Sequence, residues 1–250
     1  MLSRVANTLF WMVRNVERAD NLARLIDVNQ QLLLDFESLD SERLRGFWRP
    51  IIQSLGEEET FDKLYEEAGS SQVIRFLTDD AQNPNSIASC IAQARESART
   101  IRDQLSDDLW EEINSLYLFT RSADASFLID SNPPKYYENI RRAAATFLGV
   151  AASTMSRDEA WEFMDLGRQL ERADKTTRFL DITSYLPKSA EDEATSPGIL
   201  HWTAILRSCG AMGAFRSGHQ EISARNVVDF LIFSPEFPKS IRYCVERLDA

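Results

Sequence analysis

Two segments of this sequence share a pattern of acidic and basic side chains. Residues 14–20 read RNVERAD and residues 168–174 read RQLERAD, a separation of 154 residues. Arg24 and Arg178 extend the correspondence further along the chain. Guanidinium groups bind carboxylates and phosphates through charge-assisted, often bidentate hydrogen bonds. The chemistry that this pattern can support is therefore ion pairing between helices or the binding of an anionic ligand.

Helical spacing indicates which of these charges can meet locally, because residues three and four apart lie on the same side of a helix. The candidate site, as a charged network or an anion-binding site, consists of Arg14, Glu17, Arg18, Asp20, Arg24, Arg168, Glu171, Arg172, Asp174 and Arg178. We expect three local pairs: Asp20 with Arg24, Asp174 with Arg178, and Glu171 with Lys175. One turn earlier, Arg14 precedes Glu17 and Arg168 precedes Glu171.

Arg18 and Arg172 differ from the other arginines because no acidic residue lies three or four positions away from either. One interpretation is structural: the two long helices face each other, and both arginines pair with carboxylates of the other long helix or of a third helix. A second is an anion-binding site in which Arg14, Arg18, Arg168 and Arg172 hold a phosphate or carboxylate. A third is an exposed surface without function. Apolar residues on the same side of the first helix, Trp11, Leu22 and Leu25, favour the structural interpretation.

Other chemistries find little support in the sequence. A di-iron site of a helical bundle needs Glu three residues before His, but Gly198 precedes His201 and Arg216 precedes His219 at that distance. Cys209 and His219 could form a nucleophilic pair, although a lone cysteine on a helix is most often a small buried hydrophobe. No glycine-rich phosphate-binding loop is present. The sequence thus predicts no metal, no cofactor and no catalytic residue.

Composition limits the class of protein. The chain has 250 residues, of which 44% are hydrophobic and 27% charged, as in ordinary soluble globular proteins. A net charge of −11 argues against binding to nucleic acid or an anionic membrane. No apolar stretch is long enough to span a bilayer, and charges appear too early for a secretory signal. Three cysteines without a C-x-x-C motif suggest a reduced, cytoplasmic protein.

Apolar periodicity predicts helices along the whole chain. The clearest stripe has steps of three and four and consists of Leu9, Met12, Val16, Ala19, Ala23 and Ile26. We expect long helices over about 3–36, with Ser3 as N-cap, and about 157–185, opened by a capping box from Ser156 to Glu159. Shorter helices are expected near 41–54, 58–78, 85–105 after Asn83-Pro84, after Ser106 as N-cap, 199–213, 222–233 and 238–250. Asn132-Pro133-Pro134 marks a break, after which residues 140–155 are rich in alanine.

These elements predict an all-α protein. We expect one multi-helix bundle and a single domain over 1–250, built around two related long helices that carry the Glu-Arg motif. The last segment stays helical in pattern up to Ala250 without a capping glycine. That ending is typical of a chain that lacks some C-terminal residues.

The sequence resembles the alpha-E family, helical domains named for a recurring Glu-Arg motif. The resemblance covers essentially the whole chain and is carried by residues 1–6 (MLSRVA), 11–12 (WM), 17–20 (ERAD), 94–99 (ARESAR), 206–211 (LRSCGA) and 237–244 (FPKSIRYC). Members of this family are usually somewhat longer and have no established activity. They tend to be encoded beside, or fused to, circularly permuted ATP-grasp ligase-like proteins and transglutaminase-like cysteine protease homologues.

The resemblance implies a non-catalytic interaction or scaffold module in a bacterial peptide ligation or modification system. Its partner would be an ATP-grasp-like or transglutaminase-like protein, with no nucleic acid or membrane involved. The alternative is an enzyme or substrate-binding subunit that holds an anionic, peptide-like substrate at the Arg-rich site.

Overall fold

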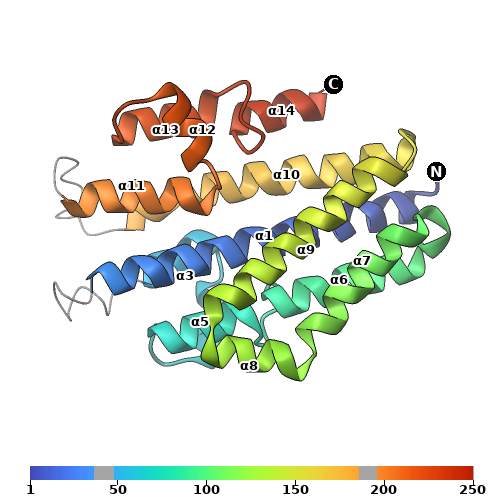
Figure 1. The fold of residues 1–250 in the computed structure, drawn as a ribbon, viewed down its shortest axis with the longest axis horizontal. Helices are drawn as coiled ribbons and strands as arrows, with labels where there is room; N and C mark the ends of the chain where they lie inside the picture. The colour runs from blue at the N-terminus through green and yellow to red at the C-terminus, as the bar shows by residue number, and fades with distance from the viewer. Residues whose placement is uncertain (37–47, 186–195, 250) are drawn as a thin grey trace. The chain divides into compact units, whose positions relative to one another are not determined.

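The computed structural model describes residues 1–36, 48–185 and 196–249, and within these ranges the chain is helical without a strand (Figure 1). The all-α prediction is confirmed. The α-helices are α1 (Ser3–Phe36), α3 (Arg49–Leu55), α4 (Glu58–Leu64), α5 (Ser70–Thr78), α6 (Ile87–Thr100), α7 (Asp107–Thr120), α8 (Ala123–Ser131), α9 (Pro133–Thr154), α10 (Glu159–Asp181), α11 (Ser196–Ser208), α12 (Met212–Gly218), α13 (Ala224–Phe233) and α14 (Ile241–Asp249). Two short 3₁₀ helices, Arg102–Gln104 and Ile182–Tyr185, follow α6 and α10.

The first long helix has the predicted bounds. Its apolar stripe is buried: Leu9, Met12, Val16, Ala23 and Ile26 have no exposed surface. Burial of one face stabilises a helix of this length far more than its intrinsic propensity does. The stripe that predicted the helix is therefore also the surface that packs.

The starts of α10 and α6 differ from the sequence prediction. At α10 the cap is Asp158 and not Ser156, because the Asp158 Oδ1 accepts hydrogen bonds from the amides of Ala160 and Trp161, at 3.0 and 3.4 Å. At α6, Ser86 accepts from the Ser89 amide. Helix α9 begins at the expected break, with Asn132 as N-cap and Pro133 in the first turn.

The region predicted as one helix over 58–78 contains two. Helix α4 ends at Tyr65, whose backbone is extended at φ −137° and ψ 135°, and α5 begins at Ser70. Of the helix predicted over 41–54, residues 41–47 lie outside the described residues, and the rest contains α3. Ser106 caps α7 as expected, accepting from the Leu109 amide at 3.2 Å.

The chain forms two compact units, and both long helices contribute residues to both. The first unit contains residues 1–23 and 77–171, and the second contains 24–76 and 172–250. The expectation of a single domain stays a prediction.

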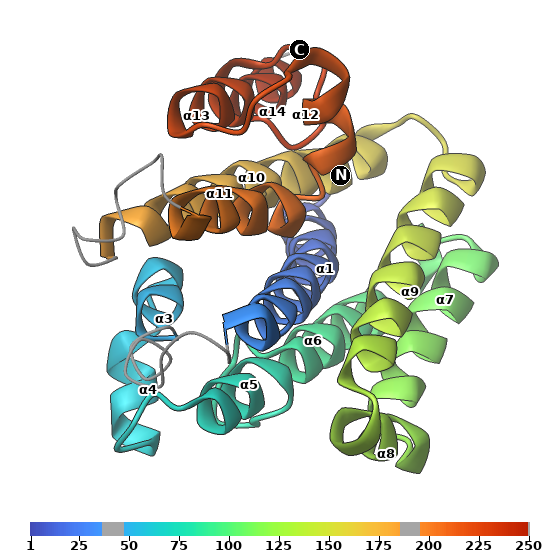
Figure 2. The ribbon, with the colours of Figure 1, turned by 60° about the vertical axis from the view of Figure 1, so that its left-hand side comes forward.

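In the first unit, α6, α7 and α9 lie side by side, and α8 connects α7 to α9 (Figures 1 and 2). Ile113 and Phe147 are fully buried there, and the hydroxyls of Thr78 and Tyr137 form a buried hydrogen bond of 2.9 Å. The Arg95 guanidinium lies over the ring of Tyr117, 5.2 Å from its centroid. These contacts hold α6 in place, and α6 borders the charged cluster described below.

In the second unit, α11 contacts α12 and α13, and α13 contacts α14. The C-terminal part of α1 packs here through Val28 and Leu32, which share a small apolar cluster with Ala204 and Leu200 of α11. This part of α1 is therefore anchored by hydrophobic burial, while its N-terminal part belongs to the first unit.

The helices recur at a fixed separation. Helices α4, α5 and α6 begin at Glu58, Ser70 and Ile87, and α12, α13 and α14 begin at Met212, Ala224 and Ile241, in each case 154 residues later. Identical residues at the same separation are Trp48 and Trp202, Gly56 and Gly210, Phe61 and Phe215, Phe76 and Phe230, Pro84 and Pro238, Ser86 and Ser240, and Cys90 and Cys244.

Local geometry recurs at these positions as well. Gly56 and Gly210 end α3 and α11 with φ of 72° and 68°, the left-handed conformation that favours glycine. The Phe61 ring stacks on Tyr65 with centroids 5.1 Å apart, as Phe215 stacks on His219 at 4.4 Å. The separation seen in the Glu-Arg segments thus extends to helices that lie far from them in the sequence.

Candidate functional site

Glu171 of α10 lies between two arginines of α1. Its Oε2 accepts from Arg14 Nε at 2.8 Å, and its Oε1 accepts from Arg18 Nε at 2.7 Å. Arg18 Nη2 also donates to Oε2 at 3.0 Å, so the Arg18 pair is bidentate. These three residues, all in the first unit, are called the Glu171 cluster below.

Arg18 has a further partner in the loop that precedes α6. Its Nη1 donates to the Oδ1 of Asn85, just before that helix begins. The backbone amide of Asn85 in turn donates to Asn83 Oδ1 at 2.9 Å, which holds the loop. Nε, Nη1 and Nη2 of Arg18 are thus each engaged by protein acceptors.

Arg14 is held by aromatic rings as well as by Glu171. Its guanidinium carbon lies 4.6 Å from the centroid of the Trp11 ring and 5.4 Å from that of Phe10. Such cation–π contacts orient a guanidinium and partly replace its hydration.

The Glu171 cluster is buried. The Glu171 side chain has no exposed surface, and those of Arg14 and Arg18 are 15% and 13% exposed. A buried carboxylate needs its partners, because removing one leaves an uncompensated charge in a poorly hydrated environment. Arg18 thus pairs with a carboxylate of the other long helix, within the first unit.

Two local pairings differ from those expected from spacing. Arg168, expected near Glu171, pairs with Asp165 instead. The Glu171 carboxylate accepts from Arg14 and Arg18. Arg14, expected near Glu17, also donates to Glu171. Glu17 and Asp20 are nevertheless buried, 1% and 8% exposed.

In the second unit, the expected pair of Asp174 and Arg178 is present, with Arg178 Nε 3.0 Å from both carboxylate oxygens. Burial raises the pKa of Asp174, but the nearby Lys175 and the hydrogen bond from Arg178 outweigh it, so its pKa lies below the usual value. Lys175 Nζ lies 3.4 Å from Asp174.

Arg178 also binds the end of α3. Its Nη1 donates to the backbone carbonyls of Ser54 and Leu55, at 3.2 and 2.8 Å. Carbonyls in the last turn lack partners within the helix, and a cation there complements the helix dipole.

Arg24 occupies the equivalent place at the end of α11. Its Nη1 lies 3.5 Å from where a Cβ of Gly210 would be, as Arg178 Nη1 lies 3.1 Å from that of Gly56. Arg24 thus lies at a helix end in the second unit. Arg172 belongs to the same unit. Arg172, Glu17 and Asp20 each have an interaction partner.

The sequence did not single out Asn85 or the stacking of Arg14 on Trp11. Asn83-Pro84 was interpreted as a helix start, and the next asparagine had no spacing signal that would connect it with Arg18. The tendency of asparagine to hydrogen-bond near helix starts is the only available hint.

Cys209 and His219, the candidate nucleophilic pair, both have partners or surroundings of a structural kind. Burial raises the pKa of Cys209 to about 12, which leaves its thiol neutral at physiological pH. His219 stacks flat on Phe215. Across the described ranges, no three His, Cys, Asp or Glu side chains converge as metal ligands. Nor is any described helix long and apolar enough to cross a bilayer.

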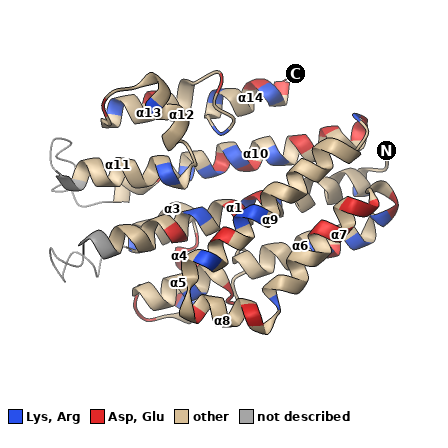
Figure 3. Cartoon of the chain, in the orientation of Figure 1, with Lys and Arg blue, Asp and Glu red and all other residues tan. Residues whose placement is uncertain are grey.

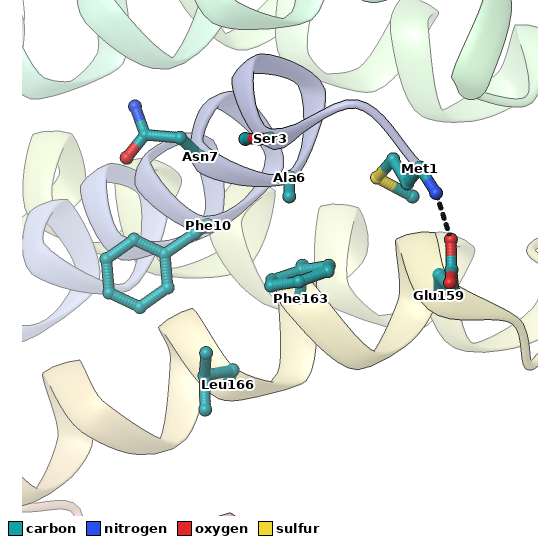
Figure 4. A pocket seen from close by; sticks show the side chains of 8 residues that line it. All are labelled: Met1, Ser3, Ala6, Asn7, Phe10, Glu159, Phe163 and Leu166. Atoms are coloured by element: carbon teal, nitrogen blue, oxygen red, sulfur yellow. Dashed lines mark hydrogen bonds and ion pairs between the residues drawn. The ribbon is translucent and has the colours of Figure 1, made fainter.

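A pocket away from the Glu171 cluster lies between the starts of α1 and α10 (Figure 4). It measures about 540 Å³, and Phe10, Phe163 and Leu166 give it a largely apolar wall. The Met1 amino group donates to Glu159 at 2.5 Å at one end. Neither Arg14 nor Arg18 lines this pocket.

Charged residues of both signs lie along α10 (Figure 3). Fold and site together define an all-helical domain in which residues of a Glu-Arg motif form internal ion pairs. The chain belongs to the Alpha-E family, described as a predicted alpha-helical domain with a conserved ER motif, whose profile matches residues 1–250.

The chain is also similar to longer proteins of mycobacteria. It is 26% identical, over 99% of its length, to the uncharacterized proteins Mb2597 of Mycobacterium bovis and MT2643 and Rv2567 of two Mycobacterium tuberculosis strains. The match spans 29% of the length of these relatives. No solved structure matches the chain significantly.

Proposed function

We propose that this domain is a non-catalytic helical interaction module of a bacterial system that ligates or modifies peptides. Its partner in this proposal is an ATP-grasp-like or transglutaminase-like protein, and both act in the cytoplasm. The observation that carries the proposal is the closure of the charged motif: the fully buried Glu171 fills the position between Arg14 and Arg18 that a substrate anion would need.

The chemistry of the potential nucleophile supports the same conclusion. A reactive cysteine needs a lowered pKa, whereas burial raises that of Cys209 to about 12. The relatives add a second argument, because in them a region like this chain is joined to a much longer polypeptide. A module that acts by organising another protein is compatible with such an arrangement.

We also infer that the domain was built by duplication of a helical unit. The constant separation of 154 residues between equivalent helix starts supports this. The positions of two arginines in the second unit support it as well. Arg24, from the first half of the chain, lies at the end of α11, and Arg178, from the second half, lies at the end of α3. Each half thus supplies a cation to a helix of the other half, which favours a rigid, mutually supported scaffold.

The alternative function is an enzyme or substrate-binding subunit that holds a phosphate or carboxylate of a peptide-like substrate at the arginines. Such a ligand would have to displace Glu171 and leave that carboxylate buried without its partners, at a large cost. We therefore place it second. A ligand that binds only the native state must raise the melting temperature, so thermal shift with phosphate, ADP, glutamate and short peptides tests it.

Co-purification tests the favoured function. The tagged chain is mixed with the ATP-grasp-like or transglutaminase-like protein of the same organism at micromolar concentration, and the complex is measured by size-exclusion chromatography with light scattering. We expect a complex of defined stoichiometry with one of them. An unrelated helical protein of similar net charge serves as the control. Clean separation of the chain from both partners contradicts the proposal.

A further inference from the structure

A second pocket lies in the first unit between α1 and α6, on the side of Trp11. It has a volume of about 350 Å³. Helix α1 contributes Thr8, Trp11 and Asn15, which are spaced by three and four residues and so share one face. Helix α6 contributes Gln93, Glu96 and Ser97 from its facing side. The volume is within the range of small-molecule sites.

Asn15 places an amide at the pocket. The residue is only 4% exposed, and within the described ranges no hydrogen bond between its carboxamide and another residue is found. Its oxygen and nitrogen are not among the fully buried polar atoms without a partner, so both keep accessible surface, and the residue lines the pocket. The carboxamide therefore offers one acceptor and one donor group to a ligand there.

Trp11 forms a preorganised wall of the same pocket. Its side chain is 41% exposed although the guanidinium of Arg14 lies on its ring and Phe10 contacts it edge to face, with centroids 5.7 Å apart. Arg14 is itself fixed by Glu171. The Glu171 cluster therefore orients an aromatic ring that remains available to a ligand.

The charges of the pocket limit the ligand. No lysine or arginine lines it, which disfavours phosphates and carboxylates. Glu96 is its one acidic side chain, and the hydrogen bond from Arg99, with Nε 3.0 Å from Oε2, lowers the pKa of Glu96 and compensates its charge. A cation would gain little there, so a neutral ligand with hydroxyl groups matches the acceptors and amides best.

We propose that this pocket binds a neutral sugar in its pyranose form. The apolar face of the ring lies against Trp11, and its hydroxyls hydrogen-bond with the carboxamides of Asn15 and Gln93 and with the Glu96 carboxylate. A hydroxyl both donates and accepts, so one ligand can satisfy the acceptor-only carboxylate and the amides together.

The second half of the chain shows that the scaffold does not require this lining. The residues 154 positions after Thr8, Trp11, Asn15 and Gln93 are Glu162, Asp165, Gln169 and Arg247. Trp11 and the uncharged Thr8 and Gln93 are thus present at the first set of positions, whereas acidic and basic residues stand at the second, as expected for a site specific to one half.

NMR titration of the isotopically labelled 250-residue chain tests the proposal. The probes are glucose, galactose and N-acetylglucosamine, with glutamine, the dipeptide Ala-Ala and inorganic phosphate for comparison. We expect at least one sugar to shift the indole N–H signal of Trp11 and the carboxamide signals of Asn15 and Gln93 with one saturable dissociation constant. The comparison compounds are expected to leave these signals unchanged.

Variants test whether sugar binding depends on the residues that line the pocket. Trp11→Leu and the surface variant Gln93→Ala should each weaken sugar binding by about tenfold or more. The matched controls Trp110→Leu and Gln104→Ala, outside the pocket, should leave the affinity unchanged. The proposal is overturned if no sugar gives a saturable shift, if glutamine or Ala-Ala shifts the signals and the sugars do not, or if Gln93→Ala binds as tightly as the parent protein.

Discussion

At the residue scale, the chain places one carboxylate against two guanidinium groups in a buried position. Glu171 has no exposed surface and accepts three hydrogen bonds from Arg14 and Arg18. A buried ion pair is not by itself evidence of net stabilisation, but loss of one partner is costly. In the first unit, these hydrogen bonds join α10 to α1.

Replacing the central carboxylate should destabilise the protein strongly. We expect Glu171→Gln to lower the free energy of unfolding by about 3–5 kcal/mol, because two arginines would remain buried without a counter-charge. Urea denaturation followed by circular dichroism measures this. Glu59→Gln, which removes an exposed carboxylate paired with Lys63, is the matched control and should leave the midpoint unchanged. Equal midpoints for Glu171→Gln and the parent protein contradict the prediction.

His201 should make stability depend on pH. Burial lowers its pKa from 6.5 to about 4, and its Nε2 has no hydrogen-bond partner within the described residues. Between these values the unfolded chain binds a proton that the folded protein does not, so stability falls as pH decreases from about 6.5 to 4. The contribution lost is on the order of 3 kcal/mol.

The variant His201→Gln isolates this contribution from that of the carboxylates. Its unfolding free energy, measured by denaturant titration from pH 4 to 7, should decrease less at the acidic end than that of the parent protein. Parallel profiles for the two proteins would show that His201 is solvated in the folded state.

At the scale of elements, close approach of the two long helices depends on one glycine. A Cβ at Gly167 of α10 would lie 2.4 Å from the backbone oxygen of Phe10 in α1. Real Cβ atoms do not approach an oxygen so closely, and a backbone atom cannot rotate away as a side chain can. Gly167 is thus a packing requirement in the middle of a helix, where glycine is otherwise unfavourable.

This requirement is testable with a matched pair of substitutions. Gly167→Ala should destabilise the protein by about 1–3 kcal/mol or more, as overpacking does. Gly149→Ala in α9, where nothing lies within 4 Å of the new Cβ, should stabilise it by about 0.5–1 kcal/mol through helix propensity. Thermal and urea unfolding measure both. A stabilising Gly167→Ala would mean that the two helices lie further apart.

At the scale of the whole molecule, helices that begin 154 residues apart have ends of the same geometry. Gly56 and Gly210 end α3 and α11 with nearly equal positive φ. Each adjoins an arginine of a long helix, Arg178 in one case and Arg24 in the other.

Equivalent substitutions should therefore have similar effects in the two halves. We expect Gly56→Ala and Gly210→Ala each to lower the free energy of unfolding by about 1–2 kcal/mol, because a Cβ disfavours the left-handed conformation. The effects should add in the double variant if the two sites are independent. An effect at only one of them would contradict the equivalence of the two helix ends.

Much of the secondary structure could be predicted from the sequence. The bounds of α1 agree because its apolar stripe is long, and the Asp174–Arg178 pair agrees because both partners lie on one helix. The cap of α10 was misplaced because Ser156 and Asp158 both suit that position, and only the backbone path decides between them. Helices α4 and α5 were merged since the apolar pattern continues across the extended Tyr65.

What the sequence by itself determined is the all-helical class, the two long helices and the repeated Glu-Arg pattern, since all of these are local signals within a few turns. Only the tertiary structure decided that Glu171 accepts hydrogen bonds from Arg14 and Arg18 and that Asn85 also accepts one from Arg18. The same holds for the pocket that Asn15 and Trp11 line. The physical reason is distance along the chain: the Arg18 partners lie 67 and 153 residues away. No helical period connects such positions, and packing alone selects them.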